Sequence, residues 1–98
     1  MKTPLYHSSK NEKNSFVSLS EKLGVITNLV ASTLTQEGYT FEAQETSLTR
    51  ADYFYSKGSE HATLTTHLSR HPLEARAEIS ANEQITKKIK KALEEILN

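Results

Sequence analysis

The spacing of apolar and polar positions divides this chain into two helices and four strands. Between residues 19 and 34 apolar side chains recur every three or four positions, which predicts an amphipathic helix. Ser18 and Glu21 have the spacing of a capping box, so the helix is expected to begin at Ser18. Gly38 suits the left-handed residue that closes a helix.

Alternation with a period of two predicts strands at 39–44, 51–56, 61–68 and 73–79. A hairpin turn is expected at 57–60 and a corner at 70–72, where Pro72 cannot donate to a sheet. At Ser80 the apolar spacing changes to three and four, which predicts a second amphipathic helix. Ser80 and Glu83 supply a second capping pair for its start.

These elements predict an α+β fold with the order α-β-β-β-β-α. The expected architecture is a single-layer antiparallel sheet of three to four strands, with both helices packed on one face. The opposite face of the sheet is then left to solvent or to a partner. Residues 16–98 are expected to form this single domain. Residues 1–15 are polar and offer little apolar surface to offset the entropy lost on ordering, so they are expected to form a flexible tail.

Composition narrows the class of protein. The 98 residues include no cysteine, which excludes disulfides, thiolate metal sites and cysteine nucleophiles. No segment approaches the roughly 20 apolar residues of a membrane span, and the first residues lack the apolar core of a signal peptide. A cytoplasmic protein is therefore expected.

The charge distribution bears on nucleic-acid binding. The formal net charge is zero, whereas a dedicated nucleic-acid binder usually carries a basic balance across its domain. Positive charge is concentrated at the two ends of the chain. In the last predicted helix it comes from four lysines, Lys87, Lys88, Lys90 and Lys91. This cluster is either a surface that contacts phosphates or a solvated face with weak ion pairs to nearby glutamates.

Groups for catalysis or metal binding are scattered. The carboxylates are spread over the predicted sheet and its loops, and no phosphate-binding loop or nucleophile elbow is present. His61 and His67 would lie about 20 Å apart along one strand, and a turn follows His67 before His71. We therefore expect no catalytic residue, no metal site and no cofactor.

The face of the sheet without helices is the candidate binding surface. Three consecutive aromatic residues cannot all point to one side of a strand, so at least one of them is expected on this face. Aromatic residues and arginine often anchor protein interfaces, although threonine is also simply a good strand former. An unpaired strand edge offers a second route to a partner or to a homodimer. The candidate partner-binding residues are Tyr53, Phe54, Tyr55, His61, Thr63, Thr65, His67 and Arg76.

The predicted order of elements resembles that of double-stranded-RNA-binding domains. In that family, lysines at the start of the last helix contact phosphates, and Lys87, Lys88, Lys90 and Lys91 stand in the corresponding place. This chain departs from the family in three ways. It lacks the glycine-rich entry to that helix, it has an extra strand, and its charge balance is not basic.

A second resemblance is to small accessory proteins of phages and conjugative elements. The segments that carry it are 47–53 and Leu68-Ser69-Arg70-His71, about a quarter of the chain. This resemblance implies a non-enzymatic protein of mobile-element type that binds a host protein or ribonucleoprotein, including as an inhibitor of a host defence complex. The alternative is direct binding of RNA or DNA through the lysine-rich helix.

Overall fold

The computed structural model describes residues 2–8 and 14–97. Its elements are β1 (Thr3–His7), α1 (Phe16–Gln36), β2 (Thr40–Thr46), β3 (Arg50–Lys57), β4 (Glu60–Arg70), β5 (Leu73–Ser80) and α2 (Glu83–Leu97). The five strands form one antiparallel sheet in the order β1-β5-β4-β3-β2. The predicted α+β class is confirmed, but the sheet has five strands where three to four were predicted.

The additional strand is β1, which lies inside the segment expected to be a flexible tail. It pairs with β5, with Thr3 opposite Ile79 and His7 opposite Arg76. Ser8 extends this pairing, because its backbone N–H donates to the Ala75 carbonyl at 2.9 Å. The tail prediction is therefore wrong for residues 3–7, since pairing with β5 supplies the order that local composition does not. The rest of its polar run, Ser9 to Lys13, lies outside the described residues.

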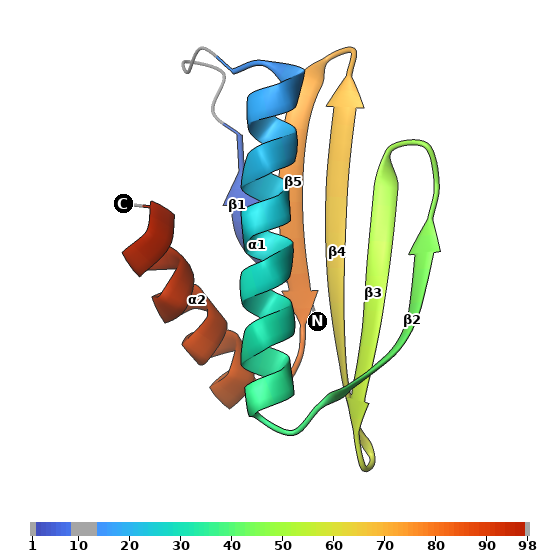
Figure 1. Cartoon of the computed structure of the whole chain (residues 1–98), viewed down its shortest axis with the longest axis vertical. Helices are drawn as coiled ribbons and strands as arrows, with labels where there is room; N and C mark the ends of the chain where they lie inside the picture. Colours follow the sequence, from blue (N-terminus) through green and yellow to red (C-terminus); the bar gives the residue numbers. More distant parts are fainter. Residues whose placement is uncertain (1, 9–13, 98) are drawn as a thin grey trace.

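Both helices lie on one face of the sheet, as expected. Helix α1 packs on β5 and β4, and α2 packs beside α1 and near β1 (Figure 1). The core between the layers is formed by the predicted apolar stripes. From α1 it includes Leu19, Leu23, Ile26, Val30 and Leu34; from the sheet Ala62, Leu64, Ala75, Ala77 and Ile79; and from α2 Ile85, Ile89 and Leu93.

Both helix starts differ from the predicted ones. Helix α1 begins one turn earlier, with Ser15 as its N-cap and Ser18 as the third residue that completes the capping box. Asn82 caps α2, because its side-chain oxygen accepts from the Ile85 backbone N–H at 2.9 Å. The predicted caps, Ser18 and Ser80, are each displaced because another polar residue in a favourable position competes for the same free N–H groups. Gly38 does close α1, with a φ of 90°.

The helices leave part of their own side of the sheet uncovered. In Figure 1, β3 and β2 extend beyond α1 without a helix in front of them. Every residue of β2 is exposed, and its outer edge has no neighbouring strand among the described residues. Neither helix within the described residues is long and apolar enough to cross a membrane. The sheet thus presents three free surfaces: its helix-free face, the β2 edge, and the helix side of β2.

Candidate functional site

The sheet face opposite the helices, here called the open face, carries most of the predicted binding residues. Residues directly opposite each other in an antiparallel pair share a face, so the register assigns each side chain. The pairs Phe54–Thr63 and His67–Arg76 lie on the open face, together with His61 and Thr65. The sequence therefore placed Phe54, His61, Thr63, Thr65, His67 and Arg76 correctly on one surface.

Two of the predicted aromatics lie on the other side. Tyr53 pairs with the buried Leu64, and Tyr55 pairs with the buried Ala62, so both face the helix side. Phe54 is thus the one aromatic of the three on the open face. A bulge between Phe41 and Ala43 also reverses the expected alternation of β2 and brings Gln44 opposite Tyr53. Such a bulge inserts one residue into a strand, which alternation alone does not reveal.

The open face is polar, and its charged groups are largely satisfied within the protein. Asp52 accepts a hydrogen bond from the Thr65 hydroxyl at 2.6 Å and pairs with Arg50 at 3.0 Å. Lys2 donates to the same Thr65 hydroxyl at 3.4 Å. A second group joins Glu74 to both Arg76 and His7, each at 3.2 Å. Thr65 is 8% exposed and the Asp52 side chain 15%, whereas the Arg50 side chain is 51% exposed, so only the contact between Thr65 and Asp52 is shielded from solvent.

These contacts change the acidity of Asp52. Burial favours the neutral acid, but the hydrogen bonds from Thr65 and Arg50, with the positive charges of Arg50 and Lys2, outweigh it and lower the pKa of Asp52. The charged carboxylate is thus the stable form at neutral pH. A partner that covered this face would have to desolvate groups that already have partners, which costs free energy.

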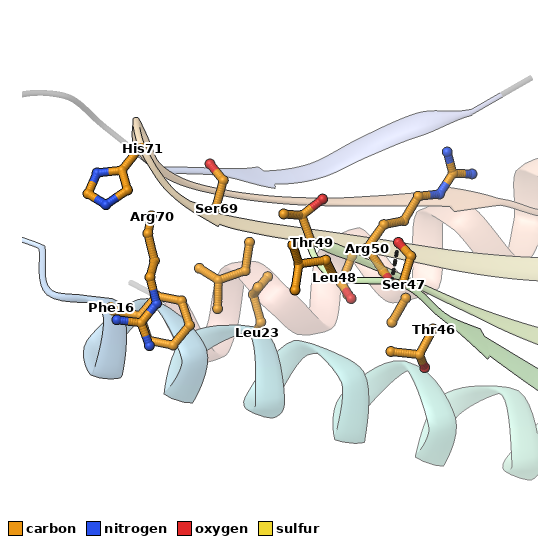
Figure 2. A pocket seen from close by; sticks show the side chains of 13 residues that line it. Phe16, Leu23, Thr46, Ser47, Leu48, Thr49, Arg50, Ser69, Arg70 and His71 are labelled. Atoms are coloured by element: carbon orange, nitrogen blue, oxygen red, sulfur yellow. Dashed lines mark hydrogen bonds between the residues drawn. The ribbon is translucent and has the colours of Figure 1, made fainter.

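A groove with different chemistry lies on the helix side. It opens between the first half of α1 and the end of the sheet where the turn between β2 and β3 lies, with a cavity volume of about 530 Å³. Figure 2 shows Phe16 and Leu23 on the helix and Leu48 on the side of the sheet. The groove is lined by Phe16, Leu23, Thr46, Ser47, Leu48, Thr49, Arg50, Ala51, Thr66, Leu68, Ser69, Arg70 and His71.

The local sequence explains how the groove is built. Ser47 closes the turn between β2 and β3, since its backbone N–H donates to the Arg50 carbonyl at 2.8 Å. The turn is attached to β4 by the Leu68 N–H, which donates to the Thr49 carbonyl at 2.8 Å. Leu48 at the tip of the turn is 99% exposed. Arg70 closes one end, with its guanidinium carbon 3.9 Å from the centroid of the Phe16 ring.

None of the described residues that line the groove is acidic. Arg70 forms no ion pair with a described carboxylate, and His71 lies beside it at the same end (Figure 2). Arg50 turns its guanidinium away from α1 toward Asp52, so only part of its side chain borders the groove (Figure 2). The groove thus combines an apolar lining with a basic end.

The lysine cluster lies on α2, on the opposite side of the sheet from the open face (Figure 1). Lys87 pairs with Glu83 at 3.1 Å and Lys88 with Glu37 at 2.9 Å. Lys90 and Lys91 are exposed and form no ion pair within the part of the chain that the structure describes. A single flat partner therefore cannot contact the open face and the lysines together.

Metal-binding geometry is not found in residues 2–8 and 14–97. No three histidine, aspartate or glutamate side chains there are close enough to hold one ion. His67 pairs across the sheet with Arg76, whereas His71 lies in the turn between β4 and β5. The two histidines therefore do not form a pair on one element.

The groove does not follow from any one stretch of the sequence. Its residues come from α1, a turn and the end of β4, which no local pattern connects. One signal was present: Leu48 is an apolar residue between Ser47 and Thr49 in a segment that separates two strands. Single exposed apolar residues are common on protein surfaces, so this signal alone does not define a site.

No protein-family model, curated protein or solved structure matches this chain. The resemblances to double-stranded-RNA-binding domains and to accessory proteins of mobile elements stay predictions.

Proposed function

We propose that this chain is a non-enzymatic protein that binds another protein through the groove between α1 and the β2–β3 turn. The observation that carries the proposal is the apolar groove of about 530 Å³ with the fully exposed Leu48 at its edge. Burial of one such leucine in an interface gains about 1.5–3 kcal/mol. The open face offers less, because it is polar and because Asp52, Glu74 and Arg76 already have partners within the protein.

The position of the groove supports the proposal. It adjoins the exposed helix side of β2, where Phe41 is exposed and contacts the buried Tyr55 of β3 in an edge-to-face arrangement. Aromatic and aliphatic side chains around a concave centre are typical of the residues that dominate protein interfaces. The open face and the β2 edge then become secondary contacts. A host protein or ribonucleoprotein as the target, and inhibition of a defence complex, stay predictions from the sequence resemblance.

The test compares two matched substitutions. Leu48→Asp places a charge at the groove, and Ile96→Asp places the same charge on α2, where Ile96 is also exposed. Both proteins are used as bait in extracts of the source cell, before and after nuclease treatment. We expect capture of a protein that survives nuclease and is lost with Leu48→Asp but retained with Ile96→Asp. Capture that is unchanged by Leu48→Asp would remove the groove as the binding site.

The second candidate function is direct binding of RNA or DNA through α2. The observation that favours it is the pair of exposed lysines, Lys90 and Lys91, without carboxylate partners among the described residues. This function predicts affinity that falls steeply with salt and weakens when both lysines become glutamine. A flat salt response excludes it.

A further inference from the structure

We propose that the occupant of the groove is an acidic amphipathic helix of the partner protein. This inference rests on the proposed function and assigns the shape and charge of the bound segment. Three properties of the described residues support it: the width of the uncovered sheet, the length of the apolar lining, and the sign of the charge at its end.

The width of the uncovered sheet matches one helix. In Figure 1, β3 and β2 lie beyond α1 without a helix in front of them. Every residue of β2 is exposed, whereas on β3 Tyr55 is buried and Tyr53 packs against the core. Neighbouring strands lie about 4.8 Å apart, so two strands provide roughly 10 Å. An α-helix with its side chains is about 10–12 Å across. A third helix placed beside α1 would complete the layer that the chain's own helices leave unfinished.

The apolar lining matches about two helical turns. Phe16 and Leu23 mark its length on α1, roughly 10 Å at the helical rise of 1.5 Å per residue. Ala51 and Leu68 contribute from the sheet side, and Leu48 borders the same cavity from the turn. A partner helix with apolar residues at positions i, i+3 or i+4, and i+7 would place them along this lining.

The charge at the groove favours an acidic partner. The positive charge of Arg70 lies at one end, and the lining contains no carboxylate. The first turn of α1 also contains no acidic residue, so the partial positive charge of the helix N-terminus is not offset by a carboxylate there. Acidic residues beside the apolar positions of the partner helix would find complementary charge here.

Strand addition at β2 has the opposite charge requirement. The charged residues of β2 are Glu42 and Glu45, and neither forms an ion pair with a described residue. A strand paired with this edge would therefore need basic residues, whereas the groove needs acidic ones. The charge of the bound segment distinguishes the two modes.

The experiment is a selection of binding peptides from a displayed random library, with the full chain as bait. We expect the selected sequences to be acidic and to have apolar residues at helical spacing. The strongest selected peptide is then synthesised, and its affinity is measured for four variants of the chain. Leu48→Asp and Arg70→Glu change the groove; Ile96→Asp and Arg76→Glu are the matched controls on α2 and on the open face.

The two groove variants should each weaken binding about tenfold or more, and the controls should leave it within about twofold. Exchange of the peptide's acidic residues for lysine should abolish binding to the unchanged protein and restore it with Arg70→Glu. Circular dichroism on each variant checks that the fold is retained. If Leu48→Asp fails this check, Leu48→Ser serves in its place.

Each other outcome overturns the inference, and the outcomes are distinguishable. Selected peptides that are basic, with apolar and polar residues alternating at a period of two, would indicate strand addition at β2. The chain would then still bind a protein, but the bound segment would not be a helix in the groove. Self-association that Leu48→Asp abolishes assigns the groove to a second copy of this chain. If no peptide is selected, or if the affinity is the same for both groove variants as for the unchanged protein, a helix is excluded as the occupant of the groove. If capture from cell extract is also lost on nuclease treatment, the proposed protein-binding function falls as well.

Discussion

Arg70, at the end of β4, stacks on the ring of Phe16, at the start of α1, with 3.9 Å between the guanidinium carbon and the ring centroid. These residues are more than fifty positions apart in the chain, and their contact closes one end of the groove (Figure 2). The contact therefore joins the helix layer to the sheet at the point where the candidate site begins.

A double-mutant cycle on this pair should reveal a coupling of about 0.5–1 kcal/mol, the range of a cation–π contact at a partly exposed site. The substitutions are Phe16→Leu and Arg70→Gln, alone and together. Urea unfolding followed by circular dichroism gives the free energy of unfolding for each protein. Strictly additive effects would show that the stacking contributes nothing to stability.

The start of α2 provides a second prediction. Asn82→Ala should lower the free energy of unfolding by about 1–2 kcal/mol, because the side chain caps Ile85 and also donates to Glu60 at 3.2 Å. Ser80→Ala should change it by no more than about 0.5 kcal/mol, since Ser80 is not the cap. Thermal and urea unfolding of both variants measures the difference. A larger effect at Ser80 than at Asn82 would contradict this assignment of the cap.

The sequence predicts those parts of the fold in which one local pattern decides the structure. The apolar stripe of α1 and the alternation of β5 both identify the buried side chains correctly, because each element buries one continuous face. Strand β1 is missed because its five residues, which include Pro4, have no alternation of their own. Its order comes from pairing with β5, a contact between segments about seventy residues apart.

The candidate site is harder to predict for the same physical reason. The open face follows from alternation, so six of its eight predicted residues lie together, while Tyr53 and Tyr55 lie on the helix side. The groove depends instead on where the two helices stop covering the sheet, and this is set by packing between layers. Only Leu48, an apolar residue in a polar turn, indicates the groove in the sequence.

The Arg50–Asp52 ion pair on the open face, with the hydrogen bond from Thr65 to Asp52, predicts a dependence of stability on pH. The pKa of Asp52 is lower in the folded chain than its ordinary value of 3.8, so the charged carboxylate stabilises the fold above that pH. This contribution is lost as the pH falls below about 4, because protonation then competes with the hydrogen bonds. Asp52→Asn should therefore lower the free energy of unfolding by about 1 kcal/mol at pH 7, and by less as the pH is lowered.

Measurement of urea unfolding between pH 3 and pH 7 checks this dependence. Thr65→Val is the control, because it keeps the shape of the side chain and removes the hydroxyl that donates to Asp52 at 2.6 Å. In the Thr65→Val protein, Asp52→Asn should lower the free energy of unfolding by less at every pH. The original chain and Asp52→Asn are compared by their free energies of unfolding. If the difference between them grew toward low pH, it would contradict a lowered pKa for Asp52.

The exposed edge of β2 leads to a prediction about self-association. An uncovered edge strand can pair with the edge of another molecule, and charged residues on it oppose such pairing. In β2 the charges come from Glu42 and Glu45, both exposed. Two copies that paired antiparallel along this edge would bring four carboxylates together, which is unfavourable. The paired substitution Glu42→Thr and Glu45→Thr removes this repulsion and adds residues that favour strands, so the protein should associate at lower concentration.

Sedimentation velocity over a concentration series measures the change. Glu94→Thr with Glu95→Thr removes the same charge from exposed positions of α2 and should leave sedimentation unchanged. Equal association in both double variants would show that net charge, and not the β2 edge, keeps the copies apart.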